Sequence, residues 1–222
     1  MPPLQWDQVG DRLYETGVDR GVLYTLDASG AYASGVVWNG LTTVTEKPTG
    51  AGATPQFADN IKYLNLIAAE SFGATVQAFT YPDEFAECDG TAVPHPGVRV
   101  GQQGRKVFGL CYRTRLGNDV EGTDFGYRLH MVWGAQASPS DKAYSTINDS
   151  PAAIDFSWDL STTPLPVAGH SELKATSLVV VDSSVVDPAD LTALEDALYG
   201  GAASTAHLPL PGAVIDMFTT GP

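Results

Sequence analysis

The fold is decided by residues 106–133, which read KVFGLCYRTRLGNDVEGTDFGYRLHMVW. Large and small or polar side chains alternate at both ends of this stretch, first around Leu110 and again around Met131. A period of two is typical of half-buried β-strands. The middle, residues 116–124, is crowded with Gly, Asn and Asp, so we expect the two strands to fold back as an antiparallel hairpin. The wider segment Gly97–Leu160 therefore predicts a long two-stranded ribbon followed by another strand.

Strands are also expected on both sides of this ribbon, because β-branched and aromatic residues gather there. The predicted ranges are 21–26, 35–45, 75–81, 154–160 and 173–182. In the last of them the run Leu178-Val179-Val180-Val181 suits a strand that is buried on both faces. Residues 61–72 fit either a helix or a strand, and we favour a strand followed by a short turn. Residues 83–90 are expected to form an acidic turn.

Only one helix is predicted, at about residues 188–199. Asp187 is a suitable N-cap, Pro188 suits the first helical position, and Gly200 follows the end. Leu191, Leu194 and Leu198 would line one face of this helix. Because so short a helix is marginal alone, we expect it to lie on the sheet and cover one side of it.

Three segments have no regular pattern. Residues 1–20 are expected to form an N-terminal arm, and residues 201–222 an extended C-terminal arm with an apolar anchor. Residues 46–60 contain two prolines and several small residues, so they predict a long exposed loop. Loops of this length in compact domains are usually functional or disordered. The fold class is therefore mainly β, a sandwich or barrel with one short flanking helix.

Composition narrows the class of protein. The chain has 222 residues, a formal charge of −14 from 26 acidic and 12 basic residues, and 43% hydrophobic residues. This length fits one all-β domain over residues 1–222, and no apolar run approaches the roughly 18 residues of a membrane span. The acidic balance argues against a surface that grips phosphate backbones. The charge can serve solubility alone, or it can form an acidic wall that repels passing DNA.

The N-terminus predicts the compartment, and the compartment bears on the state of the two cysteines. Cys88 and Cys111 could pair, but a cytosolic chain with two cysteines more often keeps free thiols. The first residues lack the charged and apolar regions of a secretory signal, so we expect synthesis and assembly in the cytoplasm.

No residue pattern predicts catalysis or a metal site. The histidines His95, His130, His170 and His207 are isolated, without the spacing of metal ligands. Neither Gly169-His170-Ser171 nor Gly101–Lys106 has the pattern that a nucleophile or a phosphate loop requires. The carboxylate pairs Asp155 with Asp159 and Glu84 with Glu87 lack a defined separation. We expect no enzyme activity and no catalytic, cofactor-binding or metal-binding residue.

Several segments together resemble the major tail protein (tail tube protein) of long-tailed, non-contractile phages. They are WNGLT at 38–42, ADNIKYL at 58–64, FTYPDEFAECDG at 79–90, GQQGRKVFGLCYRT at 101–114, GND at 117–119 and GYRLH at 126–130. The resemblance runs from about Trp38 to the predicted helix, and its segments keep their order.

The resemblance implies a structural protein of the virion tail, assembled in the host bacterial cytoplasm. Such subunits form stacked hexameric rings around a lumen through which DNA passes without specific binding. The implied partners are further copies of the chain, a tape measure protein, a tail terminator and distal tail or baseplate proteins, with no membrane and no cofactor. The loop 46–60 and the terminal arms would contact adjacent rings. Asp155, Asp159, Glu84 and Glu87 are candidates for an acidic lumen.

Two other functions stay open at this stage. One is the tube subunit of a phage-like secretion or contractile particle, which would share the fold. The other is an acidic β-sandwich that binds carbohydrate, with Trp38, Trp133 or Trp158 as a stacking platform. On alternating strands, however, tryptophans more often belong to the core.

Overall fold

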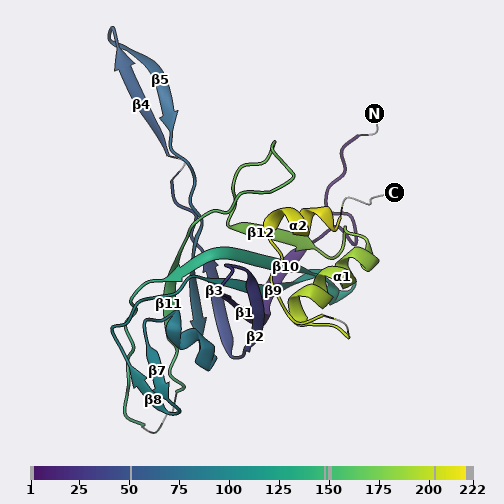
Figure 1. The fold of residues 1–222 in the computed structure, drawn as a ribbon. Helices are drawn as coiled ribbons and strands as arrows, with labels where there is room; N and C mark the ends of the chain where they lie inside the picture. Colours follow the sequence, from purple (N-terminus) through teal and green to yellow (C-terminus); the bar gives the residue numbers. More distant parts are fainter. Residues whose placement is uncertain (1–2, 51, 148, 150–151, 203, 219–222) are drawn as a thin grey trace.

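The protein is mainly β, as a computed structural model of residues 3–218, except 51, 148, 150–151 and 203, shows (Figure 1). The strands are β1 (Tyr14–Leu26), β2 (Tyr32–Trp38), β3 (Leu41–Glu46), β4 (Ala53–Ala58), β5 (Ile61–Ile67), β6 (Gly73–Ala78), β7 (Ala92–His95), β8 (Val98–Val100), β9 (Phe108–Asn118), β10 (Gly122–Ala137), β11 (Phe156–Thr162) and β12 (Leu178–Asp182). The helices are η1 (Asp83–Glu87, a 3₁₀ turn), α1 (Pro188–Tyr199) and α2 (Pro211–Asp216).

The predicted ribbon is confirmed as the centre of the sheet. β9 and β10 pair antiparallel, with Cys111 opposite Met131 and Thr114 opposite Arg128. The strand order is β2-β1-β9-β10-β11-β6-β3, and β12 also pairs with β10. β10 pairs with β12 along residues 128–132 and with β11 along residues 135–137. The long central strand therefore joins two halves of the sheet.

Both faces of the central strands are buried, which goes beyond the half-buried strands that the alternation predicted. On one face, Leu23, Leu110 and Val132 belong to a core that the curled sheet encloses. On the other face, Cys111 and Met131 belong to a second core beneath α1. The side chains of β9 and β10 do alternate with a period of two. Their two faces, however, meet two apolar cores, and neither face meets water alone.

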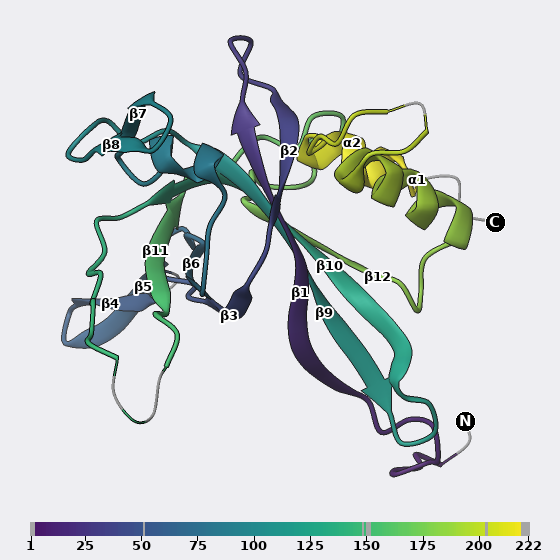
Figure 2. The same ribbon diagram turned by 90° about the horizontal axis from the view of Figure 1, so that it is seen from below.

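The helix α1 confirms the predicted range and its start signal. The Asp187 side chain accepts a hydrogen bond from the Ala189 amide at 2.8 Å, and Leu191, Leu194 and Leu198 are buried against the sheet. Figure 2 shows α1 and α2 together on one side of the long strands β9, β10 and β12. The helix therefore covers the second core, as its leucine stripe requires.

The predicted strand 35–45 is two strands. The chain breaks at Gly40, whose φ of 78° lies in the region that favours glycine. β2 pairs with β1 and β3 pairs with β6, so the two strands lie at opposite ends of the strand order although a single dipeptide, Asn39-Gly40, joins them. The connection brings both ends of the sheet around the first core.

The predicted N-terminal arm 1–20 is wrong over residues 14–20, which form the first part of β1. Its pairing with β9 shifts register twice, between Thr16 and Asp19 and between Asp19 and Val22. Gly17 and Arg20 have positive φ values of 67° and 49°. These irregularities interrupt the alternation, so the sequence pattern gave no strand here.

The predicted C-terminal arm 201–222 is packed on the body over the described residues 206–217, instead of extending from it. Leu208 donates to the Tyr32 carbonyl at 3.0 Å, and Gly35 donates to the Ala206 carbonyl at 2.9 Å. The Trp133 indole donates to the Pro209 carbonyl at 2.9 Å, and Val214 of α2 is buried. Residues 203 and 219–222 lie outside the described part.

The run at 178–181 is not buried on both faces. Val181 belongs to the second core, but Val180, which pairs with His130, is 42% exposed. The other predicted strands are confirmed with shifted ends, as β6 for 75–81 and β11 for 154–160. In β11, Trp158 and Leu160 are buried and Asp159 is exposed, as the alternation predicted.

Candidate assembly surfaces

A hairpin projects from the body where a loop was predicted at 46–60. β4 and β5 pair antiparallel and extend away from the sheet (Figure 1). Proline and small residues such as those around Pro55 usually indicate a loop, so the sequence predicted one. In the structure Pro55 lies in β4, which pairs on one side only, and a strand of this kind tolerates proline. The preference for a strand followed by a turn at 61–72 is confirmed for the strand, which is β5.

The turn of the hairpin is formed by Asp59 and Asn60. Both have positive φ, 49° and 61°. Two left-handed residues in succession match the twist of a two-residue hairpin turn, and Asp and Asn tolerate this region better than most residues. This dipeptide, which lies within the predicted loop 46–60, is the sequence signal for the hairpin.

The hairpin continues the pairing of β3 with β6 without a change of register. Thr43 pairs with Gln77, Thr49 with Ser71, and Gln56 with Leu64, so both strands advance equally between these pairs. Register shifts occur at the two ends of this pairing, between Leu41 and Thr43 and, near the tip, between Gln56 and Phe57. The projecting strands therefore keep the register of two strands that close the first core, and the isolated Thr49–Ser71 bridge lies between the two sheets.

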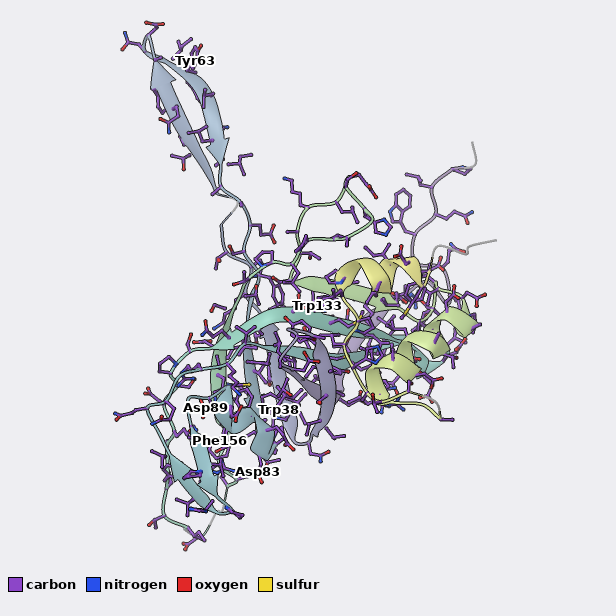
Figure 3. All side chains as sticks on the ribbon, viewed as in Figure 1. Trp38, Tyr63, Asp83, Asp89, Trp133 and Phe156 are labelled. Atoms are coloured by element: carbon purple, nitrogen blue, oxygen red, sulfur yellow. The ribbon has the colours of Figure 1, made fainter. Side chains whose placement is uncertain are left out.

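Every residue of β4 and β5 is exposed. Leu66 and Ile67 are consecutive on an extended strand, so they lie on opposite faces, and Ile67 is 69% exposed. Near the tip, Phe57 is 71% exposed and Tyr63 is 68% exposed. Figure 3 shows Tyr63 at the far end of the hairpin, remote from Trp133 in the body. Both faces of the hairpin therefore present apolar side chains that no part of the described chain covers.

The N-terminal segment is a second exposed apolar element. Leu4, Val9 and Leu13 are exposed, and Trp6 is 74% exposed. The segment is held to the β9–β10 turn by polar contacts, since the Gly10 amide donates to the Asp119 carboxylate at 2.9 Å. These contacts fix the base of the segment and leave its apolar side chains in solvent.

The positive charges of the protein are almost all neutralised by neighbouring carboxylates. Of the 12 lysines and arginines, ten lie within ion-pair distance of an Asp or Glu: Arg12, Arg20, Lys47, Arg99, Arg105, Lys106, Arg113, Arg115, Arg128 and Lys142. Within the described residues, only Lys62 and Lys174 have no such partner. A phosphate backbone would therefore have to displace a carboxylate at most basic side chains.

A bidentate ion pair joins β1 to β9. Arg113 donates to both oxygens of Asp19, at 2.7 and 2.8 Å, and Arg115 donates to the same carboxylate at 3.2 Å. The hydrogen bonds from Arg113 hold the pKa of Asp19 below its usual value, in spite of partial burial. Bidentate pairing of this kind fixes geometry as well as charge.

His130 lies in a polar cluster on the same sheet. Its ring stacks on Tyr112 at 4.6 Å, its Nδ1 lies 3.2 Å from Glu46 Oε1, and its Nε2 lies 3.0 Å from the Thr114 hydroxyl. The Tyr112 hydroxyl donates to Glu46 at 2.7 Å. The cluster ties β9 and β10 to Glu46, the last residue of β3 before the hairpin. These contacts give His130 a structural role within the sheet.

The structure does not bring the other candidate residues together into one site. His95 lies on β7, His170 follows β11, and His207 follows α1. Within the described ranges, no group of three or more His, Cys, Asp or Glu could hold a metal ion. Asp155 and Asp159 are exposed on or beside β11, where Asp159 accepts hydrogen bonds from Thr75 and Lys47 that lower its pKa. Glu84 and Glu87 lie on η1.

Trp38, Trp133 and Trp158 are buried, as expected for core residues, so none of them offers a flat face to a sugar. Cys88 and Cys111 are free and buried, one in each of the two cores. Burial raises the pKa of both thiols to about 12. No helix in the described part of the chain is long and apolar enough to span a bilayer.

Comparison with known proteins gives only weak structural likeness. No protein-family model and no curated protein matches the chain. Among solved structures, one similar chain comes from the sheath-tube complex of an extracellular contractile injection system, the PVC, in its extended state. The identity is 12%, the TM-score is 0.31, and the match covers 73% of this chain and 88% of that one.

Proposed function

We propose that this chain is a tail tube subunit of a phage tail, which assembles with its own copies into stacked hexameric rings around a channel for DNA. The role is structural, without catalysis or a cofactor, and its place is the virion tail. The observation that carries the proposal is the β4–β5 hairpin, whose apolar side chains are exposed on both faces. The ordered resemblance to tail tube proteins supports the same role.

An uncovered hairpin of this kind needs a protein partner. A two-stranded hairpin is marginally stable alone, and exposed apolar side chains on both faces favour burial in another surface. The unbroken register with β3 and β6 fixes the direction of the hairpin before it binds. Such preorganisation reduces the entropy lost on association. We infer that the hairpin contacts the neighbouring ring, together with the N-terminal segment.

Open strand edges offer the second kind of contact. Within the described residues, β3 pairs only with β6 and β12 only with β10. An edge with unpaired backbone groups favours pairing with another strand, and closure into a ring satisfies those groups. We propose that these edges join neighbouring subunits of one ring.

The paired cations suit a channel that DNA crosses without binding. Binding to duplex DNA requires basic side chains that release counterions, and ten of the 12 here are engaged by carboxylates. We propose a channel wall of neutral or negative potential, with Asp155 and Asp159 as candidates for its lining. A basic inner wall in a reconstructed ring would remove this part of the proposal.

Electron microscopy of the purified protein tests the function. The wild type is expected to form hollow tubes of regular rings. A variant in which an Asn-Gly turn replaces residues 53–67 keeps the β3–β6 pairing and should remain a folded, unassembled protein. Circular dichroism and sedimentation provide the control that it is folded. Tubes from the shortened variant, or a strictly monomeric wild type that binds a sugar tightly, would contradict the proposal. Tubes found inside a contractile sheath would instead favour a contractile particle.

A further inference from the structure

An open groove lies at the end of the molecule opposite the hairpin. Figure 3 shows Tyr63 of the hairpin and Asp83 of η1 at the two ends of the long axis, and Figure 1 shows β7 and β8 at the same end as Asp83. The groove measures about 980 Å³ and is bounded by the β1–β2 turn, η1 and the β7–β8 hairpin. Its volume is at the upper end of the roughly 300–1,000 Å³ typical of binding pockets.

The groove combines apolar walls with excess negative charge. Leu26, Val93, Pro96 and Val107 supply apolar surface. Four carboxylates line it, those of Asp27, Asp83, Glu84 and Glu87, against two cations, Arg99 and Lys106. Arg99 pairs with Asp83, and Lys106 pairs with Glu87. Glu84 has no cationic partner among the described residues, so the groove favours a ligand that is apolar and carries a positive charge.

The tip of the hairpin has this chemistry. Lys62 is one of the two cations without a carboxylate partner in the described part of the chain, and Phe57, Ile61 and Tyr63 around it are exposed and apolar. A cation within an apolar surface complements a groove of apolar walls with an unpaired carboxylate. Both members of this pair lie on the same chain, which favours a second copy as the occupant over an unrelated partner.

We propose that the hairpin tip, residues 57–63, of one copy docks into the groove of the next copy, with Lys62 facing Glu84. The inference rests on the proposed tube function and specifies its ring-to-ring contact. Because donor and acceptor surfaces lie at opposite ends, the contact is heterologous and repeats in one direction. It builds open stacks instead of closed pairs.

Charge exchange tests the contact. Lys62→Glu and Glu84→Lys should each raise the critical concentration for assembly on the order of tenfold, and the double variant should restore it. Lys174→Glu is the matched control, because Lys174 is the other unpaired cation and lies outside the groove and the hairpin. An equal effect of Lys62→Glu and Lys174→Glu, or no recovery in the double variant, would overturn the docking.

Cross-linking separates this contact from the function on which it rests. Ile61→Cys and Val93→Cys preparations, mixed and oxidised, should form a disulfide between unlike copies, and neither should do so alone. The native cysteines are buried, so wild-type protein is the blank. Regular tubes that form from the mixture without this disulfide would overturn the docking and leave the tube function standing. The disulfide in a protein that forms only irregular chains of copies would support the docking and overturn the tube.

Discussion

Substitutions at two phenylalanines, Phe85 and Phe57, should show separately what stabilises the fold and what drives assembly. Phe85 of η1 is 0% exposed and fills the first core, with ring centroids at 4.6 Å from Trp38, 5.2 Å from Trp158 and 5.4 Å from Phe108. Phe57 of the hairpin is 71% exposed and pairs across the tip with Lys62. The same substitution, Phe to Ala, therefore removes a core contact at one position and a proposed assembly contact at the other.

The magnitudes follow from these surroundings. Phe85→Ala leaves a cavity among large rigid rings, so the free energy of unfolding should fall by about 3–5 kcal/mol. For a chain of this length that lowers Tm by roughly 6–20 °C. Burying a whole phenylalanine is worth about 1.5–3 kcal/mol, so covering the exposed fraction of Phe57 contributes about 1–2 kcal/mol. The critical concentration should then rise about 5- to 30-fold, with Tm of the unassembled protein almost unchanged.

Urea titration followed by tryptophan fluorescence measures the first effect, and sedimentation over a concentration series measures the second. Phe79→Ala is a control for both, because Phe79 is exposed but lies outside the hairpin. If Phe57→Ala lowered the stability of the unassembled protein as much as Phe85→Ala, the hairpin would be packed on the body. If it left assembly unchanged, the hairpin would not be an assembly surface.

Three further results are expected. Asp19→Asn should lower the free energy of unfolding at pH 7 by about 1–2 kcal/mol, because Arg113 loses a charged acceptor. The pKa of Asp19 is lowered in the folded protein, so the difference in stability from wild type should shrink as pH falls below about 4. Denaturation curves should show no difference below the folded pKa. Cys88 and Cys111 should not react with a thiol reagent at pH 8 until the protein unfolds, and rapid labelling of the native protein would contradict their burial. Trp133→Phe should cost about 1–3 kcal/mol, because the Pro209 carbonyl loses its donor, and thermal unfolding that matched the wild type would show that the C-terminal segment does not depend on this bond.

The sequence predicted those elements whose local signal agrees with their tertiary setting. The alternation around Leu110 and Met131 gave β9 and β10, and the cap at Asp187 gave α1 to the residue. The sequence did not predict the second core. Small residues such as Cys111 lie beneath the helix on that face. A strand buried on both faces then shows the same period of two as a strand buried on one face.

The hairpin was missed for a related reason. Its outward strands have no buried face, so Pro55 and the small residues around it resemble a loop, and only the Asp59-Asn60 turn carried a local signal. The C-terminal segment was missed because hydrogen bonds to β2 far earlier in the chain hold residues 206–208 in place. The groove is equally non-local, since its walls come from three separate segments.

The unbroken register through the hairpin has a mechanical consequence. The chain enters the hairpin from β3 and leaves it through β6, and β6 is held along its length by β11, from Gly73 opposite Ser161 to Ala78 opposite Phe156. A pull on the tip is directed along these strands, so it loads the hydrogen bonds between β6 and β11 together in shear, and they cannot be peeled apart one at a time. Stretching or bending a stack of such subunits would therefore strain the contacts between copies before it unravelled the subunit itself.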